Sequence, residues 1–430
     1  AASDVYKRQV QELVNKGLIM AGHDISAGGL ITTLLEMCFS NMEGGMEISL
    51  NKIKEDDIIK ILFAENPGIV IQVKDKHKEE VKKILEDAGI GYVKLGKPTE
   101  ERHILVEKGD ATYQFGIDYL RDVWYSTSYL LDRKQSMNGC AKKRFENYKK
   151  QPLEFVFDKS FTGKLSQFGL NPDRRTPTGI KAAIIREKGT NGEREMAYML
   201  YLAGFDVKDV TMTDLVSGRE TLEDINFIVF CGGFSNSDVL GSAKGWAGAF
   251  LFNPKAKAAL DNFYARKDTL SLGVCNGCQL MIELNLINPD FTKKAKMLHN
   301  DSHKFESKFV GVTVPMNRSV MFGSLSGSKL GIWVAHGEGK FSLPYHEDKY
   351  NVVLKYSYDE YPGNPNGSDY SVAGLASPDG RHLAMMPHLE RSCFPWQNAY
   401  YPADRIKNDQ ITPWMEAFVN ARKWIEMNKK

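Results

Sequence analysis

Short apolar runs alternate with amphipathic stretches through the second half of the chain. The runs at 181–185, 207–212, 227–231 and 270–274 predict buried strands, and the stretch after the first run predicts a helix that ends at a glycine stop. Strands that alternate with helices predict an α/β domain with a mainly parallel sheet and helices on both faces. Because active sites in such sheets form at the carboxyl ends of the strands, we expect CGGFS and GVCNG to lie near each other.

The first 130 residues have a different pattern. MEISL, GIVIQV and HILVEK predict strands, KEEVKKILEDAG predicts an amphipathic helix, and GHDISAGG predicts a polar turn before a helix that starts near Gly29. Mixed elements of this kind predict an α+β layer over residues 10–130. The lysine-rich stretch SMNGCAKKRFENYKKQP has no strong period, so we expect a linker over 131–176 and a second domain over 177–430.

Composition and charge narrow the class of protein. A chain of 430 residues has room for roughly two to three globular domains. Lysine and arginine (56) nearly balance aspartate and glutamate (54), which argues against a nucleic-acid partner, and no stretch reaches the roughly 20 apolar residues of a membrane span. Six scattered cysteines are typical of a reducing compartment, so we expect a cytoplasmic protein.

The first residues have a separate interpretation. DVYKRQ is what one reading frame of a sequencing-library transposon end encodes, so we expect residues 1–9 to be non-native and the natural protein to extend upstream. The alternative is a genuine charged start to the first helix.

GVCNG has the pattern of a tight strand-to-helix turn that carries a nucleophile. Gly273 and Gly277 permit a strained turn that holds the Cys275 side chain above the sheet at a helix N-terminus, where a thiolate is favoured. A metal site would need a second pair of ligands at matching spacing, and Cys231 and Cys393 are solitary, so we expect no metal. A redox pair with Cys278 and a merely buried cysteine are the remaining alternatives.

A cysteine nucleophile needs a base, and the base needs a group that orients it. Two His-x-Glu pairs are available, His336 with Glu338 and His388 with Glu390, and their spacing does not separate them. The oxyanion of an acyl intermediate also needs N–H donors. Asn276, directly after the nucleophile, and the glycines of CGGFS, Gly233 in particular, are the candidates, although Gly-Gly after a strand also suits an ordinary turn.

Several motifs together resemble the phosphoribosylformylglycinamidine synthase family, of the large single-chain type. GVCNGCQ, CGGFSNSDVLGSAKGWA, AHGEGKF, YPGNPNGS and MMPHLERSCFPWQ resemble its glutaminase domain over about residues 177–430. GHDISAGGL, LFAENPG and LRDVW are similar to the end of its second synthetase-like half over about 10–130. The fold implied is a flavodoxin-like class I glutamine amidotransferase preceded by the C-terminal α+β subdomain of a synthetase-like half.

The resemblance also implies a function and a set of residues. Glutamine would be hydrolysed through a Cys275 thioester, with His388 as the base, Glu390 as its partner, and Gly233 and Asn276 as oxyanion donors. Ammonia would pass to a synthetase site where ATP, with Mg²⁺, activates formylglycinamide ribonucleotide. That site would lie mostly outside this chain, which would carry only the glutaminase half-reaction, and the glutaminase domain itself would need no cofactor.

Some positions depart from the family pattern, and others have two interpretations. Leu389 replaces a common proline, and Asn236 and Ser237 replace tyrosine and glycine, but none of these changes removes a reactive group. The candidates for binding glutamine are Tyr361, Asn364 and Asn366, although a turn is the stronger alternative for these residues. His23 and Asp24 belong to a family motif, yet could equally cap the following helix. A stand-alone cysteine amidohydrolase with a docking module is the alternative function.

Overall fold

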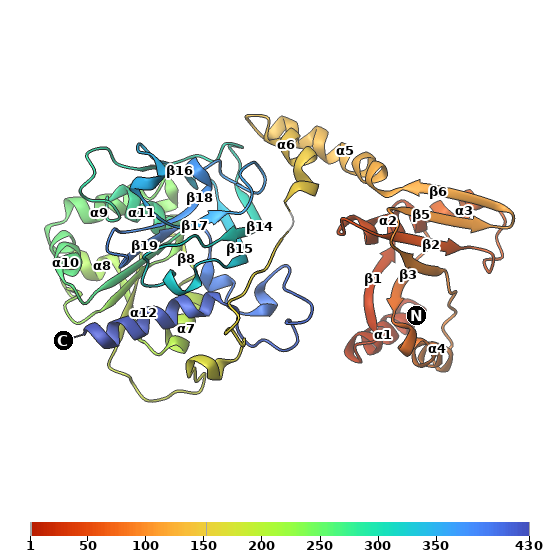
Figure 1. Ribbon diagram of the computed structural model, residues 1–430, viewed down its shortest axis with the longest axis horizontal. Helices are drawn as coiled ribbons and strands as arrows, with labels where there is room; N and C mark the ends of the chain where they lie inside the picture. Colours follow the sequence, from red (N-terminus) through yellow and green to blue (C-terminus); the bar gives the residue numbers. More distant parts are fainter. Residues whose placement is uncertain (1, 152, 430) are drawn as a thin grey trace. The chain divides into compact units, whose positions relative to one another are not determined.

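The computed structural model describes residues 2–151 and 153–429, which fall into two compact units that meet in sequence at Leu131 and Asp132 (Figure 1). Within these described ranges no helix is both long and apolar enough to cross a membrane.

The first unit is the α+β layer that the pattern predicts. A four-stranded sheet has the order β4-β2-β5-β6, and β1 pairs with β3 in a separate antiparallel ribbon. The apolar side of α2 packs on this layer through Leu30 and Leu34, beside Ile48 and Val106. The elements are α1 (Ala2–Asn15), β1 (Ile19–Ile25), α2 (Gly29–Phe39), β2 (Gly45–Ser49), α3 (Ile58–Phe63), β3 (Gly68–Val73), α4 (Lys78–Asp87), β4 (Gly96–Thr99), β5 (His103–Lys108), β6 (Ala111–Gly116) and α5 (Ile117–Gln135), which crosses the division between the units.

Two expectations for this unit need correction. The polar turn predicted at GHDISAGG is wrong for its first half, because His23 and Asp24 lie in β1, opposite Val70 and Ile69 of β3. These two residues therefore do not cap α2, whose N-cap is Gly28 with a left-handed φ of 83° and no capping side chain. Of the stretch expected to be non-native, residue 1 lies outside the described residues and the rest begins α1; its origin stays a prediction.

The second unit contains a nine-stranded sheet of order β15-β14-β17-β18-β19-β12-β10-β7-β9 in the described residues. Its elements are α6 (Cys140–Asn147), β7 (Lys181–Arg186), β8 (Thr190–Asn191), α7 (Glu193–Ala203), β9 (Asp206–Thr211), α8 (Met212–Ser217), β10 (Phe227–Phe230), β11 (Gly232–Gly233), α9 (Lys244–Phe252), α10 (Pro254–Ala265), β12 (Leu270–Val274), α11 (Asn276–Glu283), β13 (Lys296–Leu298), β14 (Glu306–Thr313), β15 (Lys329–His336), β16 (Lys340–Ser342), β17 (Asn351–Tyr356), β18 (Val372–Ala376), β19 (His382–Met385) and α12 (Trp414–Asn428).

This sheet has a parallel half and an antiparallel half. Strands β9, β7, β10, β12 and β19 run parallel, which confirms the predicted strands and the α/β class. The remaining strands, β18, β17, β14 and β15, each pair antiparallel, so the sheet is less uniformly parallel than expected. Antiparallel neighbours can be joined by short loops and need no crossover helix. A pattern of alternating strands and helices therefore does not predict these four strands.

Helices cover both faces of the parallel half. Helix α12 packs against α7 on one face, and α8 to α11 lie together on the other (Figure 1). The segment 131–176, which we expected to be a linker, is part of the second unit from Asp132 onward. Arg144 of α6 forms ion pairs with Asp132 and Glu306, and these partners explain how a lysine- and arginine-rich stretch without apolar periodicity is held in place.

Helix α11 packs so closely on β10 that no side chain fits at Gly277. A Cβ built on Gly277 would lie 2.1 Å from the carbonyl oxygen of Phe230. We expect Gly277→Ala to lower the free energy of unfolding by roughly 2–3 kcal/mol, as overpacking does in other cores. The matched control is Gly248→Ala in α9, where the new Cβ would lie no closer than 3.8 Å to any neighbour. This substitution should raise the free energy of unfolding by up to about 1 kcal/mol, because alanine is favoured over glycine in a helix. Denaturant unfolding of both variants checks this, and equal effects would contradict it.

Candidate active site

Cys275 sits at a strained turn between β12 and α11. Its backbone has φ 53° and ψ −106°, which a non-glycine residue adopts at a cost. Its N–H donates to the carbonyl of Met385 at 2.9 Å, so the turn is anchored on the neighbouring strand β19. Gly273 makes the turn possible, because a Cβ there would lie 2.5 Å from the carbonyl oxygen of Gly277. The strand-to-helix elbow predicted from GVCNG is present.

His388 and Glu390 form a buried pair beside this turn. Nδ1 of His388 lies 2.7 Å from Oε1 of Glu390, and both side chains are at most 3% exposed. A short 3-10 turn (Leu389–Arg391) brings them together. Burial alone would lower the pKa of His388, but the Glu390 carboxylate and the Cys275 thiol outweigh it and raise the pKa to about 10. The Glu390 carboxylate therefore favours the imidazolium form of His388.

The other His-x-Glu pair does not form. Nδ1 of His336 lies 3.1 Å from Oδ1 of Asn300, while Glu338 accepts from the Ser242 hydroxyl at 2.7 Å and lies 3.3 Å from Nδ1 of His299. Burial and the charge of His388 lower the pKa of His336 to about 3. His336 thus has no carboxylate to hold it and stays neutral. The geometry favours His388 and Glu390 as base and partner, an ambiguity that the residue spacing left open.

The Cys275 thiol and His388 do not share a hydrogen bond of normal geometry. The Cys275 thiol is near enough to His388 to favour its charged form, yet it donates to the carbonyl of Ala335 at 3.4 Å, and Nε2 of His388 has no hydrogen-bond partner among the described residues. Catalytic hydrogen bonds are often loose without substrate and tighten when it binds.

The predicted oxyanion donors lie on the two segments that flank Cys275. A Cβ on Gly232 would lie 2.8 Å from Cε1 of His388 and 3.3 Å from Cβ of Cys275, so the β11 backbone passes directly beside both. Gly233 follows with φ 115°, and its Cβ would lie 2.6 Å from the carbonyl oxygen of Gly189. Asn276 begins α11, where N–H groups lack intrahelical partners. The roles of Gly233 and Asn276 stay predictions.

The neighbouring cysteines are of a different kind. Cys231, Cys278 and Cys393 are buried, and burial raises the pKa of each thiol. The described cysteines are all free thiols, and within the described ranges no three His, Cys, Asp or Glu side chains are grouped to hold a metal ion. Cys278 is one turn inside α11, where a neutral thiol packs as a small apolar group.

The residues of YPGNPNGS use their polar atoms inside the fold. The Tyr361 hydroxyl donates to Oε1 of Glu306 at 3.0 Å and also bonds to Arg144. Oδ1 of Asn364 accepts two backbone N–H groups of its own turn, at 3.1 and 3.2 Å. Nδ2 of Asn366 donates to the carbonyl of Gly339 at 2.7 Å. These bonds favour the turn interpretation over the suggested grip on glutamine.

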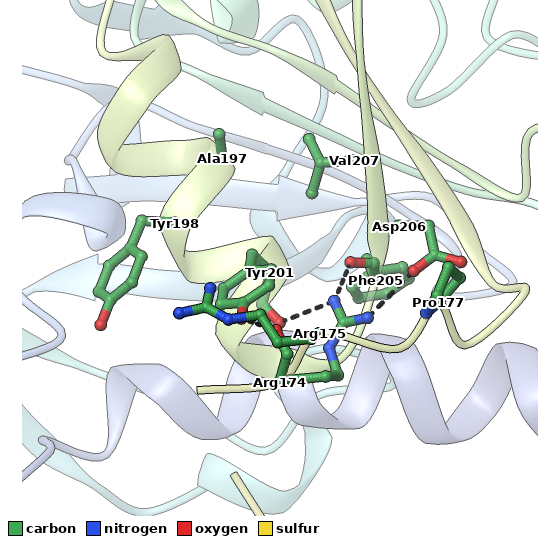
Figure 2. A pocket seen from close by; sticks show the side chains of 9 residues that line it. All are labelled: Arg174, Arg175, Pro177, Ala197, Tyr198, Tyr201, Phe205, Asp206 and Val207. Carbon is green, nitrogen blue, oxygen red and sulfur yellow. Dashed lines mark hydrogen bonds and ion pairs between the residues drawn. The ribbon is translucent and has the colours of Figure 1, made fainter. Parts of the chain in front are cut away.

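A hollow of about 480 Å³ lies away from the thiol, on the side of α7 (Figure 2). The Arg174 guanidinium crosses it, stacks on the ring of Tyr201 at 4.7 Å, and donates to the carbonyl of Phe205 at 2.7 Å and to Oδ1 of Asp206 at 3.1 Å. Its lining includes none of the predicted site residues. Arg174 acts here as a clamp between the segment before β7 and the α7–β9 connection.

Sequence reasoning missed the residues that act on the site through the backbone. Trp333 accepts the His388 N–H at 2.9 Å, Ala335 accepts the thiol, and Asn300 holds His336 across 36 residues of chain. Ala335 and Trp333 contribute carbonyl groups that every residue type has. No side-chain signal in the sequence could have singled them out.

With this geometry in view, the comparisons decide the family. The model of the CobB/CobQ-like glutamine amidotransferase domain matches residues 179–425, more than half of the chain. The chain belongs to that family. The C-terminal domain of AIR synthase related proteins matches residues 5–108. The amidotransferase match begins close to the start predicted for the second domain.

Curated relatives align with both parts. A probable phosphoribosylformylglycinamidine synthase, chloroplastic/mitochondrial, of Arabidopsis thaliana is 38% identical over 445 residues, covering 97% of this chain and 31% of the relative. The human phosphoribosylformylglycinamidine synthase is 38% identical over 449 residues, covering 96% and 33%. A structure of PurLQS from Thermotoga maritima is 27% identical, covers 58% of this chain and 99% of its own, and has a TM-score of 0.44. The amidotransferase chain spans about a third of the length of the curated relatives it matches.

The charge of Glu390 should govern how readily the Cys275 thiolate forms. Because the carboxylate raises the pKa of His388, Glu390→Gln lowers it, and the imidazolium that stabilises an adjacent thiolate is lost at a lower pH. We expect alkylation of Cys275 by iodoacetamide at pH 7.5 to slow roughly tenfold, with a pH profile moved to higher pH. The control is Glu195→Gln, on the outer side of Arg391, which should leave the profile unchanged. Equal profiles for all three proteins would contradict the role of Glu390.

Proposed function

We propose that this chain hydrolyses glutamine through a covalent thioester on Cys275. The observation that carries the proposal is a cysteine in a strained strand-to-helix turn beside a buried His388–Glu390 pair. A nucleophile, a charged imidazole and a carboxylate that fixes the imidazole are the parts that acyl transfer requires. Membership of the amidotransferase family supports glutamine as the acyl donor.

The reaction follows from these positions. His388 stabilises the Cys275 thiolate, which attacks the carboxamide carbon of glutamine, and the backbone N–H groups of Gly233 and Asn276 hold the oxyanion. The carbon–nitrogen bond then breaks and ammonia leaves with a proton from His388. Water attacks the thioester, gives up a proton to His388, and releases glutamate and the thiol.

We further propose that this activity serves a larger synthetase. The curated relatives that match 96–97% of the chain are named phosphoribosylformylglycinamidine synthases, and this chain spans about a third of their length. In such a polypeptide, the ammonia would convert formylglycinamide ribonucleotide to formylglycinamidine ribonucleotide at a site that uses ATP and Mg²⁺. The match of residues 5–108 to a synthase C-terminal domain supports an attached synthetase part. A cytoplasmic location, without nucleic-acid or membrane partners, belongs to the same proposal.

Covalent labelling tests the glutaminase proposal. A glutamine-analogue electrophile should label Cys275 stoichiometrically, and Cys275→Ser should abolish both labelling and ammonia release from glutamine. Cys278→Ser is the matched control, one helical turn away, and should retain at least about half of both because that thiol is buried and only packs. Labelling that survives Cys275→Ser, or that is lost in Cys278→Ser alone, would overturn the assignment.

A further inference from the structure

One buried acceptor on the strand that borders the thiol has no donor among the described residues. The His336 side chain is 2% exposed, and its Nε2 makes no hydrogen bond with any described residue. Buried polar atoms in proteins are nearly always paired, so an unpaired one calls for an explanation. The mechanism above gives His336 no task.

Asn300 fixes which nitrogen of His336 carries the proton. Nδ2 of Asn300 donates to the carbonyls of His336 at 2.7 Å and Lys304 at 2.9 Å, so its Oδ1 is the acceptor end. That oxygen receives the Gly339 N–H at 3.0 Å and lies 3.1 Å from Nδ1 of His336. Nδ1 must therefore be the donor, which leaves Nε2 as a bare lone pair.

The surrounding charges keep the ring in this state. The His388 imidazolium and the Lys308 ammonium both oppose a second positive charge, and together with burial they hold the pKa of His336 near 3. His336 thus remains a neutral acceptor while His388 is charged.

His336 ends a strand that touches the catalytic residues at two points. Strand β15 accepts the His388 N–H at Trp333 and the Cys275 thiol at Ala335, the residue directly before His336. The unpaired Nε2 therefore belongs to the segment that borders the thiol. The substrate can supply the hydrogen-bond donor that Nε2 of His336 lacks.

We propose that His336 is a second functional histidine, whose Nε2 accepts a hydrogen bond from the carboxamide nitrogen of glutamine and then from the departing ammonia. The carboxamide carries two N–H donors, and one of them must be held for the nitrogen to be presented to His388. Asn300 is the positioning residue that sets the tautomer. This proposal rests on the glutaminase function proposed above and gives it a group that recognises the leaving group.

Two substrates separate this role from a structural one. Glutamine has N–H donors on its leaving group, whereas the γ-methyl ester of glutamate has none and passes through the same thioester. We expect His336→Leu to lower kcat/KM for glutamine by roughly 10- to 100-fold and to leave kcat/KM for the ester within about threefold. His336→Gln, which can place an acceptor near Nε2, should recover part of the loss for glutamine.

The controls make each result decisive. His346→Leu changes a histidine that is 75% exposed and should alter neither substrate. Labelling of Cys275 by iodoacetamide should proceed normally in His336→Leu, which shows that the fold and the His388 pair are intact. Equal losses for both substrates, or no loss for glutamine, would overturn the role of His336. Failure of the unmodified protein to form any thioester would instead reject the glutaminase proposal.

Discussion

The buried contact between His388 and Glu390 is the interaction on which the rest of the site depends. Moving an imidazolium and a carboxylate out of water costs free energy unless the two form an ion pair. The surrounding fold must therefore hold His388 and Glu390 within contact distance. The His388 N–H to Trp333 fixes the start of the short turn, and the strands β12 and β19 fix the distance to Cys275. The turn at Cys275 adds its own strain. Site geometry here is imposed by the core rather than by the site residues themselves.

The antiparallel half of the sheet contacts the Cys275 thiol through strand β15. Strands β14 and β15 extend the sheet beyond the βα repeats, and an isolated bridge joins Trp333 of β15 to His388. The parallel half supplies the nucleophile and the glycines that flank it. The two halves thus provide different kinds of group, side chains from one and mainly backbone carbonyls from the other.

Much of this organisation could be predicted from the sequence, and the remainder has a clear physical reason. Local patterns were sufficient for the parallel strands, the elbow at Cys275 and the α+β layer, because each depends on residues close together in the chain. Residue spacing alone did not separate His336 from His388, because the contact that distinguishes His336 is with Asn300, 36 residues away in the chain. Strand β1 was mistaken for a turn because its polar residues His23 and Asp24 interrupt its apolar pattern.

The glycines around Cys275 also define which sequence variants of this domain can work. A Cβ at Gly232 would lie 2.8 Å from Cε1 of His388 and 3.3 Å from Cβ of Cys275, so a side chain there would force at least one of the two residues to move. A relative with another residue at this position would therefore need a different arrangement of His388 and Cys275.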